Sequence, residues 1–188
     1  MSQTLIVAKF GGTSVADFEA MNRSADVVLQ DASTRLVVLS ASAGITNLLV
    51  ALAEGQQAPQ RAALLDDIRR IQYAIVDRLQ RPDVIRDEID RMIDNISMLS
   101  EAASLATSNA LTDELVSHGE LMSSLLFVEI LRERQVNAEW FDVRKVMRTS
   151  DRFGGAEPDV TALAELATQQ LAPRLDEGLV ITQGFIGS

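Results

Sequence analysis

A lysine and two glycines stand at the end of the first apolar run of the chain. Residues 4–9 read TLIVAK, and Phe10, Gly11 and Gly12 follow directly. Glycine lets a backbone approach a ligand closely, and the helix expected next would point its free N–H groups at the same place. With the charge of Lys9 added, this spacing favours a phosphate site. A tight strand-to-helix turn with a solvent-exposed lysine explains the same spacing equally well.

This motif, KFGGTS, differs from the two common glycine-rich nucleotide motifs. It has neither the GxxxxGK[ST] spacing of a P-loop nor the GxGxxG spacing of dinucleotide-binding folds. The glycines therefore indicate a phosphate site only together with other features of the chain.

A second loop of small residues follows the next apolar run. Residues 35–40 read RLVVLS, and ASAGITN comes directly after them. The hydroxyls of Ser40, Ser42 and Thr46 could bind a polar ligand, and Gly44 would let that ligand come close. A turn in which Thr46 caps the next helix is the simpler interpretation of this loop alone.

A glutamate on a long helical stretch is the third candidate. In ELVSHGELMSSLLF, Glu120 shares a helix face with apolar and small hydroxyl residues, and Gly119 and Ser123 would let another backbone approach the helix. A carboxylate held against a close neighbour is suited to binding an ammonium group. Most helical glutamates are simply exposed, which is the competing interpretation. His118 is the single histidine and on its own indicates neither a metal site nor a catalytic triad.

Charged residues also gather after a later predicted strand. They are Asp142, Arg144, Lys145 and Arg148. Such a cluster is typical of a solvated loop, and we assign it no role.

The elements that must position the candidate residues alternate between strand and helix. Residues 4–9 are mostly apolar, as in a strand buried on both faces, and Ser14 with Asp17 resembles a capping box. The predicted order is a strand at 4–9, a helix at 15–29, a strand at 35–40 and a helix at 47–54. This alternation predicts an α/β fold with a parallel-rich sheet.

The middle of the chain reads as helical. Apolar residues three and four apart run through two stretches separated by QRPD, with Pro82 suited to the first turn of the second helix. We expect these helices to pack as an antiparallel hairpin, inserted into the α/β domain at about 57–110. The elements predicted after it are a helix at 112–134, a strand at 136–141, a helix at 159–171 and a strand at 178–183.

Composition and charge narrow the function classes. The 188 residues suit one α/β domain, and 47% of them are hydrophobic, enough for a sizeable core. A net charge of −10 disfavours nucleic-acid binding, because such a surface repels a phosphate backbone. Without cysteine there is neither a disulfide framework nor a thiolate metal site. We find no signal peptide and no apolar run that could span a membrane, so we expect a cytoplasmic protein with no membrane partner.

Four motifs in this order resemble the aspartokinase family. They are KFGGTSVA at the N-terminus, SASAGITNLL after the second strand, SHGELMSS on the long helix and ITQGFIGS at the end. The resemblance covers the whole chain and looks closest to the lysine-sensitive, single-function bacterial form. It implies the amino acid kinase fold, a three-layer sandwich with a parallel-rich sheet between helices. It also implies transfer of the γ-phosphoryl group of ATP, used with Mg²⁺, to the side-chain carboxylate of L-aspartate.

The resemblance further implies which residues would contact the nucleotide phosphates. Lys9 would be catalytic, neutralising charge on the transferring phosphoryl group. The turn of Phe10, Gly11 and Gly12 would cradle that group, and Ser40 would lie beside the phosphates.

For the amino acid, the resemblance implies a second set of residues. Thr46 and Glu120 match the aspartate-binding positions, with Glu120 binding the α-ammonium group, and Phe185 would form the pocket wall. No residue of the chain is implied as a metal ligand.

Aspartokinases continue beyond a region like this one with an arginine- and glycine-rich segment, a nucleotide-binding half-domain and regulatory domains. The resemblance therefore implies that residues 1–188 are the aspartate-binding, N-terminal part of a longer, homo-oligomeric enzyme. We expect this part alone to show little or no kinase activity and no feedback inhibition by lysine. A sheet edge left bare would tend to pair with another chain, giving dimers or aggregates.

Two alternatives stay open. Another amino acid kinase, acting on glutamate, an acylated glutamate or a nucleoside monophosphate, would share the lysine and glycines of the first motif. A non-catalytic binding or assembly module would keep the fold without the reaction.

Overall fold

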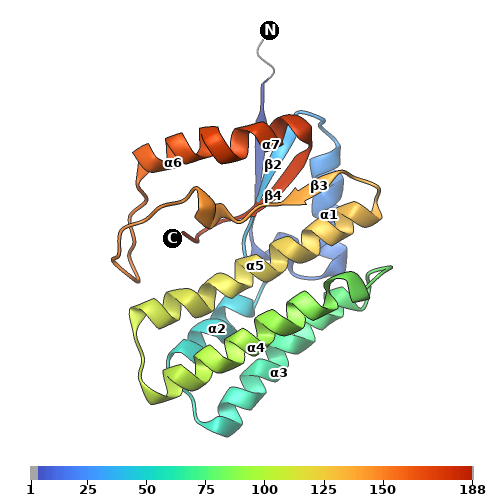
Figure 1. The fold of residues 1–188 in the computed structure, drawn as a ribbon. Helices are drawn as coiled ribbons and strands as arrows, with labels where there is room; N and C mark the ends of the chain where they lie inside the picture. Colours follow the sequence, from blue (N-terminus) through green and yellow to red (C-terminus); the bar gives the residue numbers. More distant parts are fainter. Residues whose placement is uncertain (1–3, 188) are drawn as a thin grey trace.

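Four parallel strands form one sheet in the order β1-β2-β4-β3 (Figure 1). The structure is a computed structural model that describes residues 4–187. The strands are β1 (Ile6–Phe10), β2 (Thr34–Leu39), β3 (Ala138–Trp140) and β4 (Leu179–Gln183). The parallel sheet predicted from the alternating pattern is confirmed, with β1 and β3 at its edges.

Helices cover both faces of this sheet. α1 (Phe18–Leu29) connects β1 to β2, whereas α6 (Val160–Leu166) and α7 (Ala172–Glu177) connect β3 to β4. These two connections cross the sheet in opposite directions, and because such crossovers are nearly always right-handed, their helices lie on opposite faces. α1 packs into the main hydrophobic cluster, and α6 and α7 pack into a second one around Phe141 and Val180. The three-layer arrangement is thus present.

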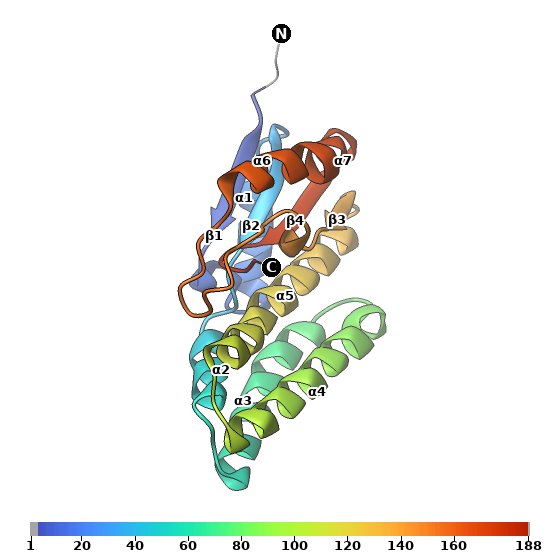
Figure 2. The same ribbon diagram turned by 60° about the vertical axis from the view of Figure 1, so that its left-hand side comes forward.

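The middle of the chain forms a helical part at one end of the sheet. It consists of α2 (Ile45–Ala53), α3 (Ala58–Val76), α4 (Asp83–Leu105) and α5 (Asn109–Glu133). α3 and α4 lie side by side in Figures 1 and 2 and are joined by a short connection, which confirms the predicted hairpin. Pro82 takes the N-cap position of α4, one position before the predicted first turn.

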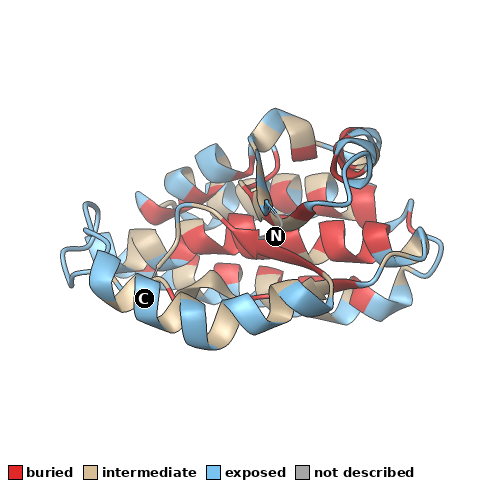
Figure 3. Cartoon of the chain, turned by 90° about the horizontal axis from the view of Figure 1, so that it is seen from above, coloured by how far each residue is buried: buried red, intermediate tan, exposed pale blue. Residues whose placement is uncertain are grey.

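α5 joins the helical part to the sheet. It packs against α2 and α4 and, further along, against β3 and β4. Fifteen of its 25 residues are buried, so it is a core helix rather than a surface helix. Figure 3 shows the buried residues gathered in the centre of the molecule, with the outer sides of the helices exposed. The main hydrophobic cluster runs from the sheet through α5 into the hairpin, so the hairpin shares the core of the sheet.

The first strand is less buried than predicted. β1 lies at an edge of the sheet, and Val7 is 52% exposed. Ala8 and Phe10 pack against the main cluster, whereas Val7 and Lys9 alternate to the other face. The prediction of a strand buried on both faces was wrong, because an apolar run does not reveal whether its strand is central or at an edge.

The helix after the glycines begins later than predicted. A 3₁₀ turn (Gly12–Val15) comes first, and α1 starts only at Phe18. Its cap is Asp17, whose carboxylate accepts the N–H of Ala20 at 2.8 Å, and not Ser14. Both residue types are good caps, so the motif alone did not decide between them.

The next helix begins two residues earlier than predicted. Gly44 is the N-cap of α2, with φ at +89°, a backbone conformation that favours glycine. Thr46 therefore lies inside the first turn and does not cap the helix.

The last helical segment is longer than predicted. α6 passes through a π-helical turn, Ala167–Leu171, into α7 and ends at Glu177 rather than at residue 171. Pro173 has no N–H to donate to the preceding turn, which accounts for the irregular hydrogen bonding there. β3 is shorter than the predicted strand at 136–141.

The packing of α5 against the loop after β2 gives a test of the fold. A Cβ at Gly119 would lie 2.7 Å from the Cβ of Ala41. We expect Gly119→Ala to lower the free energy of unfolding by about 1 to 3 kcal/mol through overpacking, although alanine elsewhere in a helix is favoured by about 1 kcal/mol. Urea unfolding measures the difference. Gly155→Ala is the matched control, because its Cβ would meet nothing closer than 3.9 Å; equal losses in both variants would contradict the close approach.

Candidate functional site

The carboxyl ends of β1, β2 and β4 come together at one edge of the sheet. The direction in which the chain crosses the sheet reverses between β2 and β4. Parallel α/β proteins bind ligands in the crevice at such a point. The N–H of Ser40 donates to the carbonyl of Phe10 at 3.2 Å, and the N–H of Gly184 donates to the carbonyl of Leu39 at 2.9 Å. The three segments that follow these strands are therefore fixed against one another.

The glycine turn after β1 packs directly on the loop after β2. The N–H of Ala43 donates to the carbonyl of Gly12 at 3.1 Å, and a Cβ at Gly12 would lie 2.9 Å from the carbonyl oxygen of Ala41. A Cβ at Gly11 would meet nothing within 4 Å. Gly12 is thus required by packing, whereas Gly11 borders open space in which a ligand could approach the backbone.

Lys9 and Phe185 meet at this edge. The Nζ of Lys9 lies 4.4 Å from the centroid of the Phe185 ring, within the range of a cation–π contact. Phe185 is 80% exposed and has φ at +63°, a left-handed conformation that is uncommon for a bulky residue. The two residues were predicted for the same site from opposite ends of the chain, and they are in contact.

Glu120 is a buried carboxylate beside the same loop. Its side chain is on α5 and is 4% exposed, and its Oε2 has no hydrogen-bond partner among residues 4–187. Burial raises the pKa of Glu120 to about 7, although backbone hydrogen bonds, including one with Ala41, oppose the shift. A buried carboxylate with one oxygen unpartnered is suited to a cationic ligand, and the competing interpretation of an exposed surface glutamate is wrong.

The neighbours of Glu120 hold α5 against the loop after β2. The hydroxyl of Ser123 donates to the carbonyl of Ser40 at 2.7 Å, and Gly119 lies against Ala41. The prediction that Gly119 and Ser123 let another backbone approach this helix is confirmed. Ser40 thus contributes its carbonyl oxygen to the docking of α5.

The two other hydroxyls of the loop after β2 differ in exposure. Thr46 is exposed in the first turn of α2. Ser42 is 1% exposed, and its Oγ has no hydrogen-bond partner within the described part of the chain. Thr46 can therefore reach a ligand in solvent, whereas Ser42 faces the interior.

A cavity of about 590 Å³ opens beside this edge. It lies between the first half of α5, the segment at 147–158 and the residues after β4. Phe185 lines it, as do Ser117 and Arg144, but Lys9 and Glu120 do not. The predicted site residues thus border the cavity from one side rather than surround it.

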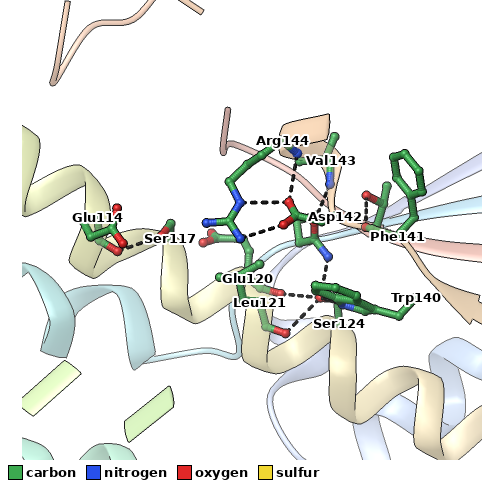
Figure 4. A network of polar contacts seen from close by, with 12 residues as sticks. Glu114, Ser117, Glu120, Leu121, Ser124, Trp140, Phe141, Asp142, Val143 and Arg144 are labelled. Carbon is green, nitrogen blue, oxygen red and sulfur yellow. Dashed lines mark hydrogen bonds and ion pairs between the residues drawn. The ribbon is translucent and has the colours of Figure 1, made fainter. Parts of the chain in front are cut away.

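Four polar residues that sequence analysis gave no role belong to the same network as Glu120, and three of them, Ser124, Asp142 and Arg144, lie near it in Figure 4. Arg144 binds Asp142 through two hydrogen bonds, at 2.9 and 2.7 Å. Burial raises the pKa of Asp142, but the hydrogen bonds and charge of Arg144 outweigh this and hold the pKa below its ordinary value. The other two, Ser124 and Gln183, are hydrogen-bonded to each other at 2.9 Å. Gln183 could have been found as the polar residue that ends an apolar run.

His118, the single histidine, contacts the backbone of its own helix. It is buried, and its Nδ1 lies 2.8 Å from the carbonyl oxygen of Glu114. Across residues 4–187, no three His, Asp or Glu side chains are grouped so that they could hold a metal ion. In the same range, no helix is both long and apolar enough to cross a membrane.

Comparison with known proteins decides the family. The model of the amino acid kinase family matches residues 4–188. The chain belongs to the amino acid kinase family. Its sequence is 75% identical over 184 residues to lysine-sensitive aspartokinase 3 of Escherichia coli (strain K12), covering 98% of this chain and 41% of that protein. The chain thus spans about two fifths of the length of this relative.

Solved structures of the family match the fold of the chain. The crystal structure of E. coli aspartokinase III in complex with aspartate and ADP superposes with a TM-score of 0.98 at 74% identity, over 98% of this chain and 41% of that one. Aspartate kinase of Clostridium acetobutylicum matches with a TM-score of 0.71 at 18% identity, over 98% of this chain and 40% of that one, which shows the shared fold alone.

The burial of Glu120 predicts a pH dependence of stability. Its pKa is raised from 4.5 to about 7 in the folded protein, so the folded state holds this proton more tightly than the unfolded state does. The protonated Glu120 therefore stabilises the fold below the unfolded pKa, and this stabilisation is lost as the pH rises toward 7, by at most about 3 kcal/mol.

We expect Glu120→Gln to remove this loss, so that the stability of the variant relative to wild type increases between pH 5 and pH 8. Urea unfolding across this range measures it, and Glu101→Gln, an exposed residue on α4, should keep the wild-type profile. Parallel profiles for wild type and Glu120→Gln would contradict the burial of a titrating carboxylate.

Proposed function

We propose that this chain is the acceptor-binding part of an aspartate kinase, which transfers the γ-phosphoryl group of ATP to the side-chain carboxylate of L-aspartate and forms 4-phospho-L-aspartate. The observation that carries the proposal is the TM-score of 0.98, at 74% identity, with an aspartokinase III that binds aspartate and ADP. The contact of Lys9 with Phe185 and the unpartnered Oε2 of Glu120 support it from the chain itself.

The reaction asks mainly for positioning and charge neutralisation. The aspartate side chain is already ionised at pH 7, so the nucleophile needs no general base. One carboxylate oxygen forms a bond to the γ-phosphorus, the bond from that phosphorus to the β–γ bridging oxygen breaks, and ADP leaves with the electron pair. Such a transfer depends on in-line alignment and on positive charge at the phosphoryl oxygens.

The positions of the side chains support the proposed roles at the phosphate end of the site. Lys9 is the catalytic cation, and the open space beside Gly11 admits the phosphates. Phe10 and Gly12 complete the turn, and Ser40 lies next to it through its hydrogen bond to Phe10.

The amino acid is proposed to bind on the α5 side of this turn. Glu120 takes the α-ammonium group, which would supply the partner that its Oε2 lacks. Thr46 offers an exposed hydroxyl from α2, and the exposed ring of Phe185 forms the wall.

Magnesium is proposed as the ion that accompanies ATP, but residues 4–187 offer no group of three acidic or histidine side chains to hold it. No step of the mechanism is therefore assigned to a metal ligand of this chain. We also propose that 1–188 is the N-terminal part of the kinase domain with a helical insertion at about 57–110, and that the enzyme is cytoplasmic and homo-oligomeric.

A non-catalytic module of the same fold is the second candidate. A relative in Haemophilus influenzae is named as an aspartokinase 3 thought to be inactive. It is 44% identical over 112 residues, which make up 60% of this chain and 90% of that protein. Activity of the full-length protein separates the two candidates.

Replacing Lys9 tests the catalytic role. In the full-length protein we expect Lys9→Met to lower kcat by about 100- to 1,000-fold, because the developing charge on the phosphoryl group loses its cation. A coupled assay of ADP release measures this, and circular dichroism checks the fold. Lys145→Met, also an exposed lysine, is the matched control and should keep the wild-type rate. An unchanged rate in Lys9→Met would favour the non-catalytic module.

Competition between amino acids tests the substrate. We expect L-aspartate to raise the Tm of the full-length protein, whereas L-glutamate at the same concentration leaves it unchanged, because the side chain of glutamate is one methylene longer. Differential scanning fluorimetry measures both. Stabilisation by glutamate alone would favour a glutamate-type kinase instead.

A further inference from the structure

Gln183 is a buried hydrogen-bonding hub at the carboxyl end of β4. It is 2% exposed. Its Nε2 donates to the hydroxyl of Ser124 on α5 at 2.9 Å, and its Oε1 accepts the N–H of Val143 at 2.9 Å. One side chain thus connects the end of a central strand, the core helix and the segment after β3.

Ser124 uses its full hydrogen-bonding capacity in this network (Figure 4). A hydroxyl has one proton to donate and two lone pairs that accept. Ser124 donates to the carbonyl of Glu120 at 2.7 Å and accepts from Nε1 of Trp140 and from Gln183, both at 2.9 Å. Removing Gln183 would therefore disturb a complete set of bonds that ends on the backbone of Glu120.

A second bond holds the same turn of α5 from the other side. The hydroxyl of Ser123 lies 2.7 Å from the carbonyl oxygen of Ser40, at the end of β2, and 3.2 Å from the carbonyl oxygen of Glu120. The turn that carries Glu120 is thus tied to the ends of two neighbouring strands, β2 through Ser123 and β4 through Gln183.

The amide of Gln183 orients its neighbours through hydrogen bonds, which an apolar side chain could not do. An apolar side chain of similar size would fill the same space without the cost of burying polar atoms. What only the amide supplies is a fixed separation between Ser124, Val143 and the end of β4. Phe185 follows Gln183 by two residues, and Glu120 lies one helical turn before Ser124, so the amide lies between the segments that carry the pocket wall and the carboxylate.

We propose that Gln183 is a positioning residue for the acceptor amino acid: through Ser124 and Val143 it fixes Glu120 and Phe185 at the spacing that the amino acid requires. The proposal rests on the proposed function. Gln183 does not touch the reacting atoms. Because it acts on Glu120 and Phe185, which are proposed to bind the amino acid, its loss weakens binding of the acceptor and leaves binding of the nucleotide intact.

The test is the KM of Gln183→Met in the full-length protein. We expect the KM for aspartate to rise about tenfold and the KM for ATP to stay unchanged. Gln72→Met is the matched control, because Gln72 is also a buried glutamine, 1% exposed, but neither of its amide atoms has a partner within residues 4–187. Its KM for aspartate should equal that of wild type.

A second variant keeps the test decisive if Gln183→Met does not fold. Ser124→Ala removes the hydroxyl that joins Gln183 to Glu120, and it should raise the same KM without changing that for ATP. Because both residues act through one network, the double variant should raise the KM no further than the larger single effect.

The possible failures are distinguishable. A wild-type protein without activity on aspartate would overturn the proposed function and the role of Gln183 with it. An active wild type, with KM for aspartate unchanged in the variants or with both KM values raised alike, would overturn the role of Gln183 alone.

Discussion

The close approach of α5 to the loop after β2 is the constraint on which the rest of the site depends. The absence of a side chain at Gly119 brings the helix against Ala41, and the bond from Ser123 to Ser40 holds it there. This approach excludes water from Glu120 and thereby raises its pKa. The raised pKa of Glu120 is thus a consequence of the short distance between α5 and the loop after β2. If the helix lay a few ångströms further away, the same carboxylate would be hydrated.

The two ionisable groups proposed for the site, Lys9 and Glu120, have no partner of opposite charge among the described residues. Burial favours the protonated form of Glu120, and the ammonium of Lys9 lies against the ring of Phe185. Neither side chain forms a salt bridge with another described residue. A proton and an aromatic ring are easier to displace than a carboxylate or guanidinium partner would be. Arg144, in contrast, already has a carboxylate partner in Asp142. On the proposed function, the phosphoryl group would replace the ring of Phe185 as the partner of Lys9, and the α-ammonium group of the amino acid would pair with Glu120.

The sequence predicted the helices and strands better than it predicted which of their residues are buried or cap a helix. The apolar periodicity of the middle helices and the alternation of strands were sufficient to predict the hairpin and the parallel sheet. The edge position of β1 was not predictable, because Val7 is as apolar as a buried residue and only the strand order exposes it. The predicted cap of α1 was wrong for a related reason. Ser14 and Asp17 are both residue types that cap helices, and in the structure Asp17 is the cap. Local chemistry limits the choices, and tertiary packing selects among them.

The sequence indicated several residues of the site, but not which of them are hydrogen-bonded to one another. Ser123 and Ser40 are 83 residues apart and Gln183 and Ser124 are 59 apart, and no local pattern pairs them. One general rule nevertheless leads to Ser40 and Gln183, and also to Lys9. In a parallel sheet every strand ends at the same edge, so a polar residue that ends an apolar run lies beside the others that do. Lys9, Ser40 and Gln183 each end such a run. The first two were singled out for the glycine and hydroxyl motifs beside them, and the strand-end rule also leads to Gln183, whose side chain turns inward to α5 rather than outward to a ligand.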